Sequence, residues 1–307
     1  MTTEFFEFCS GDEKLSAALW LPEGEPKAVL QITHGMTEHI GRYAAFAQGL
    51  TERGVAVCGF DLRGHGKNGT DEEIASLGKG GWELTLSDMR CFYTEMKKRI
   101  PRAPYFMMGF SLGSFLLREY LSLYPQDAQG AVIVGTGYQP GLVLTLIMAI
   151  VKAECRKAGF DGTTALVKKL SFETYNEKFR PNETDSDWLC ADGDELYEYM
   201  RDPLCRKYIS AGLFHQLLGS MKRTGKRGAA AAWRKNMPVL FLSGEDDPVG
   251  NGGKGVFAVS DRLKKCGMTD VTVCLFPNAR HDLLHEKQSA NADKAAETLL
   301  GWLEERV

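Results

Sequence analysis

The 307-residue sequence lacks an excess of either charge, a paired cysteine motif and an amino-terminal leader pattern. Its 37 basic and 40 acidic side chains leave a net charge of −3 with no basic block, so we expect no nucleic-acid partner. The eight cysteines are scattered without a C-x-x-C pair, which argues against structural zinc and against a disulfide framework. The first residues, MTTEFFE, contain no basic region followed by an apolar core, so no signal peptide is predicted. We therefore expect reduced thiols in a cytoplasmic protein.

Long hydrophobic runs are also missing. The longest mainly apolar segment is LVLTLIMAIV, residues 142–151, whereas a helix that spans a bilayer needs about 20 residues. This segment is compatible with a helix buried inside the protein and equally with a surface that touches lipid or an acyl chain. The acidic residues 180–199 could suggest a metal site, but their Asp-Ser-Asp and Asp-Gly-Asp triplets are typical of turns and helix caps. We expect a solvated loop, a helix start and no metal there.

Short apolar segments separated by helical patterns make up most of the chain. Residues 4–10 and 14–22 alternate apolar and polar side chains, as in a β-hairpin. Further strands are predicted over 28–35, the start of 55–66, 105–108, 130–137, 238–244 and 271–278, and helices over 41–53, 82–100, the residues after Ser111 and 292–305. Nearly continuous apolar strands separated by helices predict a mostly parallel eight-stranded α/β sheet with helices on both faces and an antiparallel edge.

The interval 138–236 interrupts this alternation because it is mostly helical and holds no strand of matching quality. We expect residues 1–137 and 237–307 to form one α/β core and residues 138–236 to form a helical cap, or lid, inserted into it.

Ser111 lies in the stretch YFMMGFSLGSFLLREY, between Gly109 and Gly113, where an apolar strand changes to a helical pattern. The G-x-S-x-G spacing at a strand-to-helix turn is typical of a nucleophile elbow, because larger flanking residues would clash in so sharp a turn. A serine that only caps a helix is the alternative. We expect Ser111 to be a nucleophile.

A serine nucleophile needs a base and an acid that orients the base. His281 follows the last predicted strand, and Asp246 and Asp247 follow the strand before it. The carboxyl ends of parallel strands meet at one edge of a sheet, so these side chains should converge on Ser111. The order Ser, Asp, His along the chain is that of the α/β-hydrolase triad.

The chain resembles α/β-hydrolases of the monoacylglycerol lipase/lysophospholipase group, which shares the family label serine aminopeptidase S33. The similar segments are HGMTEHIGRY (34–43), FDLRGHGKN (60–68), the Ser111 elbow, SGEDDPVG (243–250) and NARHDLLHE (278–286). The resemblance implies an acyl ester of monoacylglycerol or lysophospholipid type as substrate, an apolar channel under the cap, possible transient contact of the cap with a lipid surface, no cofactor, no metal and no protein partner.

The resemblance also selects residues within the loops. The group places its acid three residues after the strand-ending glycine, here Gly244, which favours Asp247 over Asp246. The following Pro248 also favours an extended backbone at Asp247. The oxyanion hole is expected from the backbone N–H groups of Met36 and Leu112.

Other polar residues are expected to be structural. His34, Glu38 and His39 should brace the oxyanion loop, His65 should hold its glycine-rich loop, and Asp61 should pair with Arg63. His215 and His285 are expected at the surface or in the cap. The strand end at 135–137 (Gly-Thr-Gly) has no carboxylate and offers no alternative acid.

Two rival functions remain open at this point, an aminopeptidase and a non-catalytic receptor or scaffold, whereas a dehalogenase is disfavoured. A proline iminopeptidase-type aminopeptidase shares the family label, but those enzymes typically carry tryptophan where Leu112 stands. A dehalogenase would use an aspartate as its nucleophile. A non-catalytic hydrolase-fold receptor or scaffold belongs to a different class, and turnover of a short-chain aryl ester would separate it from an enzyme.

Overall fold

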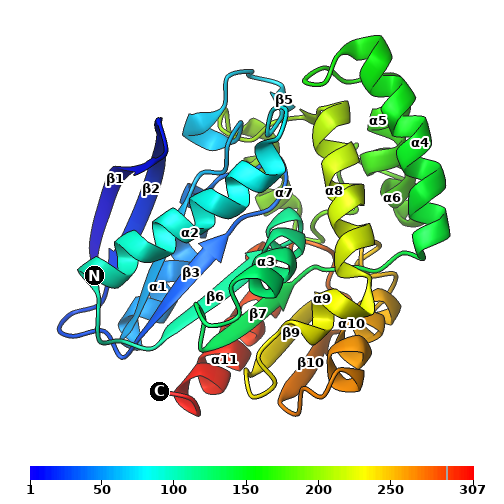
Figure 1. Ribbon diagram of the computed structural model, residues 1–307. Coiled ribbons are helices and arrows are strands. Elements are labelled where there is room, and N and C mark those ends of the chain that lie inside the picture. The colour runs from blue at the N-terminus through cyan, green and yellow to red at the C-terminus, as the bar shows by residue number, and fades with distance from the viewer. Residues whose placement is uncertain (288–289) are drawn as a thin grey trace.

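An eight-stranded sheet forms the centre of the protein in a computed structural model that describes residues 1–287 and 290–307 (Figure 1). The strand order is β1-β2-β4-β3-β6-β7-β9-β10. The strands are β1 (Thr2–Ser10), β2 (Glu13–Leu21), β3 (Ala28–Thr33), β4 (Val55–Phe60), β6 (Tyr105–Phe110), β7 (Gly130–Val134), β9 (Val239–Gly244) and β10 (Val271–Phe276). Only the β1–β2 and β2–β4 pairs are antiparallel. The predicted mostly parallel sheet with a hairpin edge is confirmed.

Helices cover both faces of this sheet. On one face lie α2 (Gly81–Arg99), α3 (Leu112–Leu123) and α10 (Lys254–Lys265), and on the other lie α1 (Ala44–Glu52) and α11 (Asn291–Glu304). Consecutive strand residues alternate between two cores: Met107 packs in one and Met108 in the other. Because both faces are buried, both sets of positions must be apolar, which explains the nearly continuous apolar runs. Each fully buried aliphatic side chain contributes about 1.5–3 kcal/mol.

The long connection between β7 and β9 is mostly helical. It contains α4 (Gly141–Ala158), α5 (Ala165–Lys168), a π-helical turn (Lys169–Glu173), α6 (Thr174–Asn176), α7 (Gly193–Arg201), α8 (Ala211–Thr224) and α9 (Arg227–Ala231). A two-residue strand, β8 (Tyr208–Ile209), pairs with β5 (Ile74–Ala75) and ties this connection to the loop before α2. Figure 1 shows α4, α5, α6 and α8 beyond the carboxyl ends of the central strands, on the side away from both termini.

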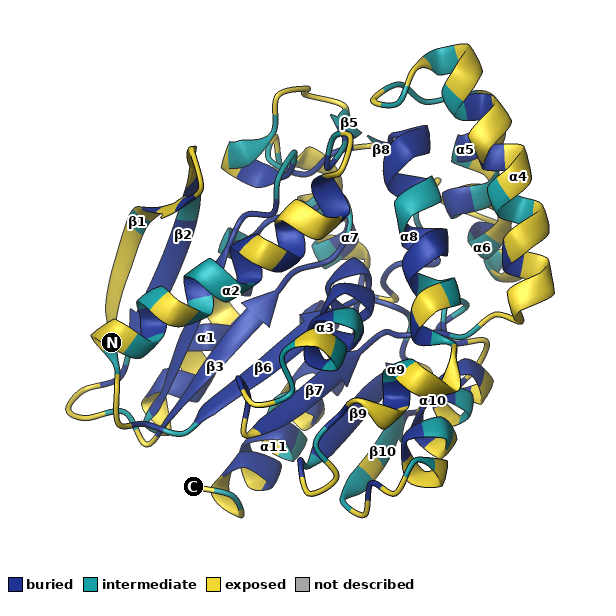
Figure 2. Cartoon of the chain, in the orientation of Figure 1, coloured by how far each residue is buried: buried dark blue, intermediate teal, exposed yellow. Residues whose placement is uncertain are grey.

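Helix α4 contains the apolar segment 142–151 and is only half covered. Leu144 and Val151 are buried, whereas Leu142 and Leu146 are 83% and 68% exposed and Ile150 is also exposed. These exposed residues recur every four positions and so form a stripe on one side of the helix. Figure 2 shows much of α4 in yellow, the colour of exposed residues. Among the described residues, no helix is long and apolar enough to cross a membrane.

Candidate active site

Ser111 sits at the tight turn between β6 and α3 with a backbone φ of 49°, a left-handed value rare for a residue with a side chain. A Cβ on Gly109 would lie 2.3 Å from the Gly113 carbonyl oxygen, and a Cβ on Gly113 would lie 1.9 Å from that of Thr33. Only glycine fits at these two positions. The predicted elbow geometry is therefore present, and its strain lifts the serine side chain above the strand ends.

His281 and Asp247 lie in line with Ser111. The Ser111 Oγ is 2.8 Å from His281 Nε2, and His281 Nδ1 is 2.9 Å from Asp247 Oδ1. A carboxylate can only accept, so Nδ1 carries the proton and Nε2 is left as the basic nitrogen that faces the hydroxyl. All three side chains are buried. The arrangement can move a proton from the serine hydroxyl to the histidine while the carboxylate stabilises the resulting cation.

The two adjacent aspartates of the acid loop have different surroundings. Asp247 is fully buried, and its Oδ1 also accepts the Val249 N–H at 2.8 Å. Asp246 is half-exposed and forms an ion pair with Lys178 at 3.0 Å. Only Asp247 contacts His281, which supports its selection as the acid.

The loop after β3 brings Met36 beside the serine. Met36 and Ser111 line the same cavity, and Thr37 adopts a left-handed φ of 62° directly after it. Within residues 1–287 and 290–307, no protein acceptor receives the N–H of Met36 or of Leu112. Two free donors at this place are what an oxyanion hole requires.

A buried ionic network links this loop to the segment that carries His281. Glu38 accepts the Gly35 N–H at 2.6 Å and pairs with Arg42, and Arg42 reaches Asp282 at 2.8 Å. Asp282 also pairs with His285 at 2.6 Å. Burial alone would raise the pKa of Asp282, but the His285 and Arg42 charges outweigh it and hold that pKa below its usual range. Glu38 therefore braces the loop after β3, the loop for which the oxyanion role is predicted.

Two predicted side-chain placements are wrong. Arg63 does not pair with Asp61: its guanidinium bonds Asp88 of α2 through Nε at 2.6 Å and Nη2 at 2.9 Å. Asp61 instead accepts backbone N–H groups of Ile40 and Lys67, because its side chain turns into the loop while that of Arg63 turns toward α2. His285 is buried in the ionic network rather than placed at the surface or in the cap.

The other histidines fit their expected structural roles. His34 Nε2 accepts the Leu62 N–H at 2.9 Å, and His65 Nδ1 donates to the Arg63 carbonyl oxygen at 2.8 Å. Burial lowers the pKa of His34, and burial with the neighbouring His34 lowers the pKa of His65 to about 3. His215 is half-buried on α8, within the inserted segment.

A cavity of about 190 Å³ opens beside Ser111 and His281. Its other walls come largely from the connection between β7 and β9. They include Lys168, Phe172, Trp188, Tyr199, Lys207 and Tyr208. The Trp188 ring lies 5.1 Å from the His281 ring and shields it from solvent. Sequence reasoning missed Trp188, because residues 180–199 were expected to form a solvated loop; the one tryptophan in that acidic stretch was the available signal. No residue of 142–151 is among the described residues that line the cavity.

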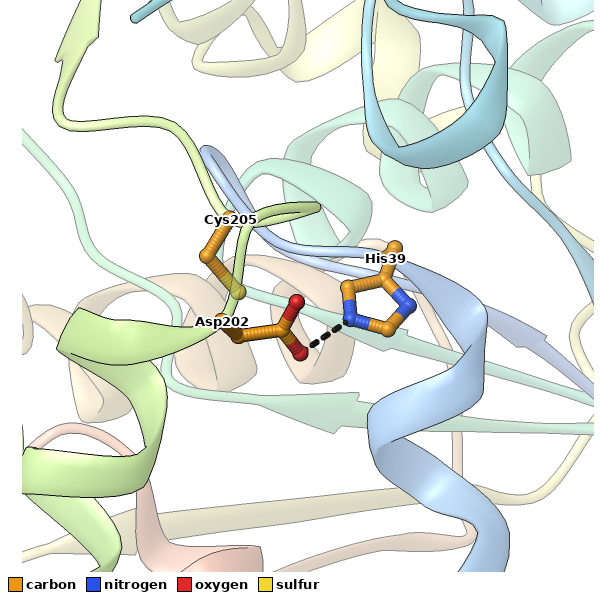
Figure 3. Close-up of side chains that lie close together, drawn as sticks. All are labelled: His39, Asp202 and Cys205. Carbon is orange, nitrogen blue, oxygen red and sulfur yellow. Dashed lines mark hydrogen bonds and ion pairs between the residues drawn. The ribbon is translucent and has the colours of Figure 1, made fainter. Parts of the chain in front are cut away.

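Figure 3 shows His39, Asp202 and Cys205 pointing toward one another, with possible ligand atoms within 4.8 Å. His39 Nε2 and Asp202 Oδ2 are hydrogen-bonded at 2.8 Å, and Asp202 Oδ1 accepts the Leu204 N–H at 2.8 Å. These two hydrogen bonds explain why the three side chains lie close together: they hold the loop after β3 against the residues that follow α7. Burial raises the pKa of the Cys205 thiol. The absence of a metal requirement stays a prediction.

The sequence profile of the family described as Hydrolase_4, serine aminopeptidase S33, matches residues 24–288. The chain belongs to this family. The match confirms the resemblance noted from the motifs.

Several proteins similar to the chain are described as lipases or esterases. Monoglyceride lipase of Rattus norvegicus is 25% identical over 289 residues, which cover 94% of this chain and 86% of that protein. Monoacylglycerol lipase of Mycolicibacterium smegmatis is 24% identical over 290 residues, with 91% and 89% covered. The fold matches a carboxyl esterase from Bacillus coagulans with a TM-score of 0.88 at 23% identity, covering 99% of this chain and 98% of that one. A soluble variant of the Saccharomyces cerevisiae monoglyceride lipase with a substrate analog matches with a TM-score of 0.77 at 17% identity, covering 99% and 96%.

Proposed function

We propose that this protein hydrolyses monoacylglycerol-like esters through Ser111, His281 and Asp247. It is a serine hydrolase of the carboxylic-ester class, as its family and its lipase relatives support. The observation that carries the proposed residue roles is the hydrogen-bonded chain from Ser111 Oγ through the His281 ring to Asp247 Oδ1, at 2.8 and 2.9 Å.

The reaction follows from the positions of these atoms. Ser111 Oγ attacks the ester carbonyl carbon while its proton passes to His281 Nε2, and Asp247 stabilises the imidazolium. The N–H groups of Met36 and Leu112 bind the oxygen that becomes negative. The Nε2 proton then goes to the leaving alcohol oxygen, which frees the alcohol and leaves an acyl-enzyme. Water repeats the steps on the acyl-enzyme and releases the carboxylic acid.

We propose that residues 138–236 act as the cap over this site. Trp188, Tyr199 and Tyr208 of this segment line the cavity beside Ser111, so the segment bounds the space that the ester must enter. Closing such a site excludes bulk water and strengthens the electrostatic interactions inside it.

We further propose that the exposed stripe of α4, Leu142, Leu146 and Ile150, makes transient contact with a lipid surface. The stripe faces outward and does not line the cavity, so burial of its side chains in a membrane interface would bring the cap to lipid without blocking the site. Substrates of the monoacylglycerol type partition into such interfaces.

The cytoplasm stays our predicted location for the protein. Its eight free thiols fit a reducing compartment.

A panel of esters of graded acyl length, assayed beside aminoacyl arylamides, tests the proposal. We expect esters to be cleaved and the rate to rise with chain length until the cavity is full, because each buried methylene contributes about 0.8 kcal/mol. Faster cleavage of a prolyl arylamide than of any ester would favour the aminopeptidase instead. No turnover of any substrate would favour a non-catalytic scaffold.

A further inference from the structure

Arg118 of α3 is a buried cation that the proposed reaction does not use. It is only 5% exposed. Its Nη1 donates to Thr136 Oγ1 at 3.2 Å and to the Gly137 carbonyl oxygen at 3.1 Å, and its Nη2 donates to Thr224 Oγ1 at 3.4 Å. All three acceptors are neutral. These bonds use at most three of the five guanidinium N–H groups and leave the positive charge without a counter-charge.

A second guanidinium makes the imbalance larger. Arg262 of α10 donates to Tyr138 Oη at 2.7 Å and to the Gly225 carbonyl oxygen, again neutral acceptors. Burial, followed by the charge of Arg262, lowers the pKa of Arg118 to about 10, so Arg118 is still cationic at neutral pH. Among the described residues, no carboxylate forms an ion pair with either arginine. A buried charge without a partner is strongly unfavourable, and proteins normally compensate it.

A small cavity of about 20 Å³ lies beside these two side chains. Both arginines line it, and the remaining wall is mostly apolar, from Trp233, Val259 and Leu263 among others. Ser122 also lines it, but its hydroxyl donates to the Arg118 and Ala229 carbonyl oxygens. A volume slightly above the minimum for one water accepts a monatomic species and excludes a tetrahedral oxyanion.

We propose that this cavity binds a single halide ion, chloride under ordinary conditions, between the guanidinium groups of Arg118 and Arg262. A monovalent anion supplies the missing counter-charge, which a neutral water does not. The mostly apolar wall of the cavity and the two guanidinium donors that line it suit a large, weakly hydrated anion. The ion would join α3 to α10 and, through Arg118, support the Thr136–Gly137 segment that leads from β7 into the cap.

Crystals grown in sodium bromide give the direct test. An anomalous peak between the Arg118 and Arg262 guanidinium groups is the expected result. No bromide peak there, including density that refines as water, would overturn the proposal.

Thermal unfolding gives an independent test. Replacing sodium gluconate by sodium chloride at constant ionic strength should raise the Tm of the wild type by about 2–4 °C, as binding of a ligand at roughly tenfold its Kd predicts. The Arg262→Gln variant should lose this rise. Arg234→Gln is the matched control, because Arg234, like Arg262, donates to neutral acceptors, here the carbonyl oxygens of Ala128 and Gln129, and does not line the cavity. Equal Tm values in the two salts, or a rise retained in Arg262→Gln, would contradict halide binding. Arg262 is half-exposed, so its substitution leaves a folded protein more readily than that of Arg118.

Discussion

Replacement of Asp247 by asparagine isolates the charge of the proposed triad acid. Asp247 Oδ1 receives both the His281 Nδ1–H, at 2.9 Å, and the Val249 N–H, at 2.8 Å. An asparagine oxygen in the same place keeps both hydrogen bonds. Its amide nitrogen then occupies the place of Oδ2, 3.4 Å from the Ser243 hydroxyl, which can accept. The geometry is conserved, and what disappears is the negative charge beside the imidazolium.

The size of the effect follows from that separation. Two unit charges 2.9 Å apart at an effective dielectric constant of about 20 interact by roughly 6 kcal/mol. This interaction exists only after His281 has taken the serine proton, so its loss raises the barrier rather than weakening substrate binding. At about 1.4 kcal/mol per factor of ten, we expect kcat to fall by about 10⁴, similar to the loss in the Ser-His-Asp template.

Steady-state hydrolysis of a soluble short-chain aryl ester measures this fall. Asp246→Asn is the matched control: Asp246 is half-exposed and contacts Lys178. A surface ion pair is worth about 0–1 kcal/mol, so kcat should change less than about fivefold. Retention of more than about a tenth of the activity by Asp247→Asn would refute the electrostatic role. A larger loss in Asp246→Asn than in Asp247→Asn would show that the acid has been assigned to the wrong residue.

Three further predictions address the nucleophile, the cap surface and the stability of the fold. Ser111→Ala should abolish ester hydrolysis and labelling by a fluorophosphonate probe with an unchanged circular dichroism spectrum; labelling of another serine in the wild type would contradict this. Leu146→Glu should slow hydrolysis of a long-chain monoacylglycerol in vesicles several-fold but leave a soluble short-chain ester unaffected, because Leu146 is exposed on α4; equal slowing of both would indicate a structural role instead. Burial lowers the pKa of His65 to about 3 in the folded protein, whereas in the unfolded chain this histidine has its ordinary pKa of about 6.5. Between these two pH values the unfolded chain therefore binds one more proton than the folded protein. The free energy of unfolding should fall as the pH falls, by up to about 1.4 kcal/mol per pH unit. His65→Gln should make that decline shallower in urea titrations at pH 6, 5 and 4, and an unchanged slope would show that His65 is not buried as a neutral side chain.

Much of the fold could be predicted because its signals are local. The apolar runs of β3, β4, β6, β7 and β9 follow from burial on both sheet faces. The position of Ser111 between two glycines follows from a turn in which a Cβ would lie 1.9–2.3 Å from a carbonyl oxygen. Both signals act within a few residues of the chain, so the sequence displays them directly.

The partners of charged groups are a different matter. Arg63 is two residues from Asp61, yet it pairs with Asp88, because α2 packs against the loop and brings that carboxylate within 2.6 Å. His285 pairs with Asp282, only three residues away, but its burial is not a local property, because the distant segment of Arg42 packs against it and Arg42 pairs with the same aspartate. Long side chains reach any partner within several ångströms, so neighbours in the sequence are poor guides to their contacts.

The sequence by itself determined the sheet, the elbow and the order of the three residues proposed for catalysis, because periodicity, turn sterics and strand ends are properties of short segments. The preference for Asp247 over Asp246 came from the family resemblance, but only the tertiary structure shows the contact of Asp247 with His281, the cover of that histidine by Trp188, and the cavity that Arg118 and Arg262 share without a carboxylate. Each of these depends on side chains that are 34 to 144 residues apart in the chain. Their proximity is set by the packing of whole elements, which no local pattern encodes.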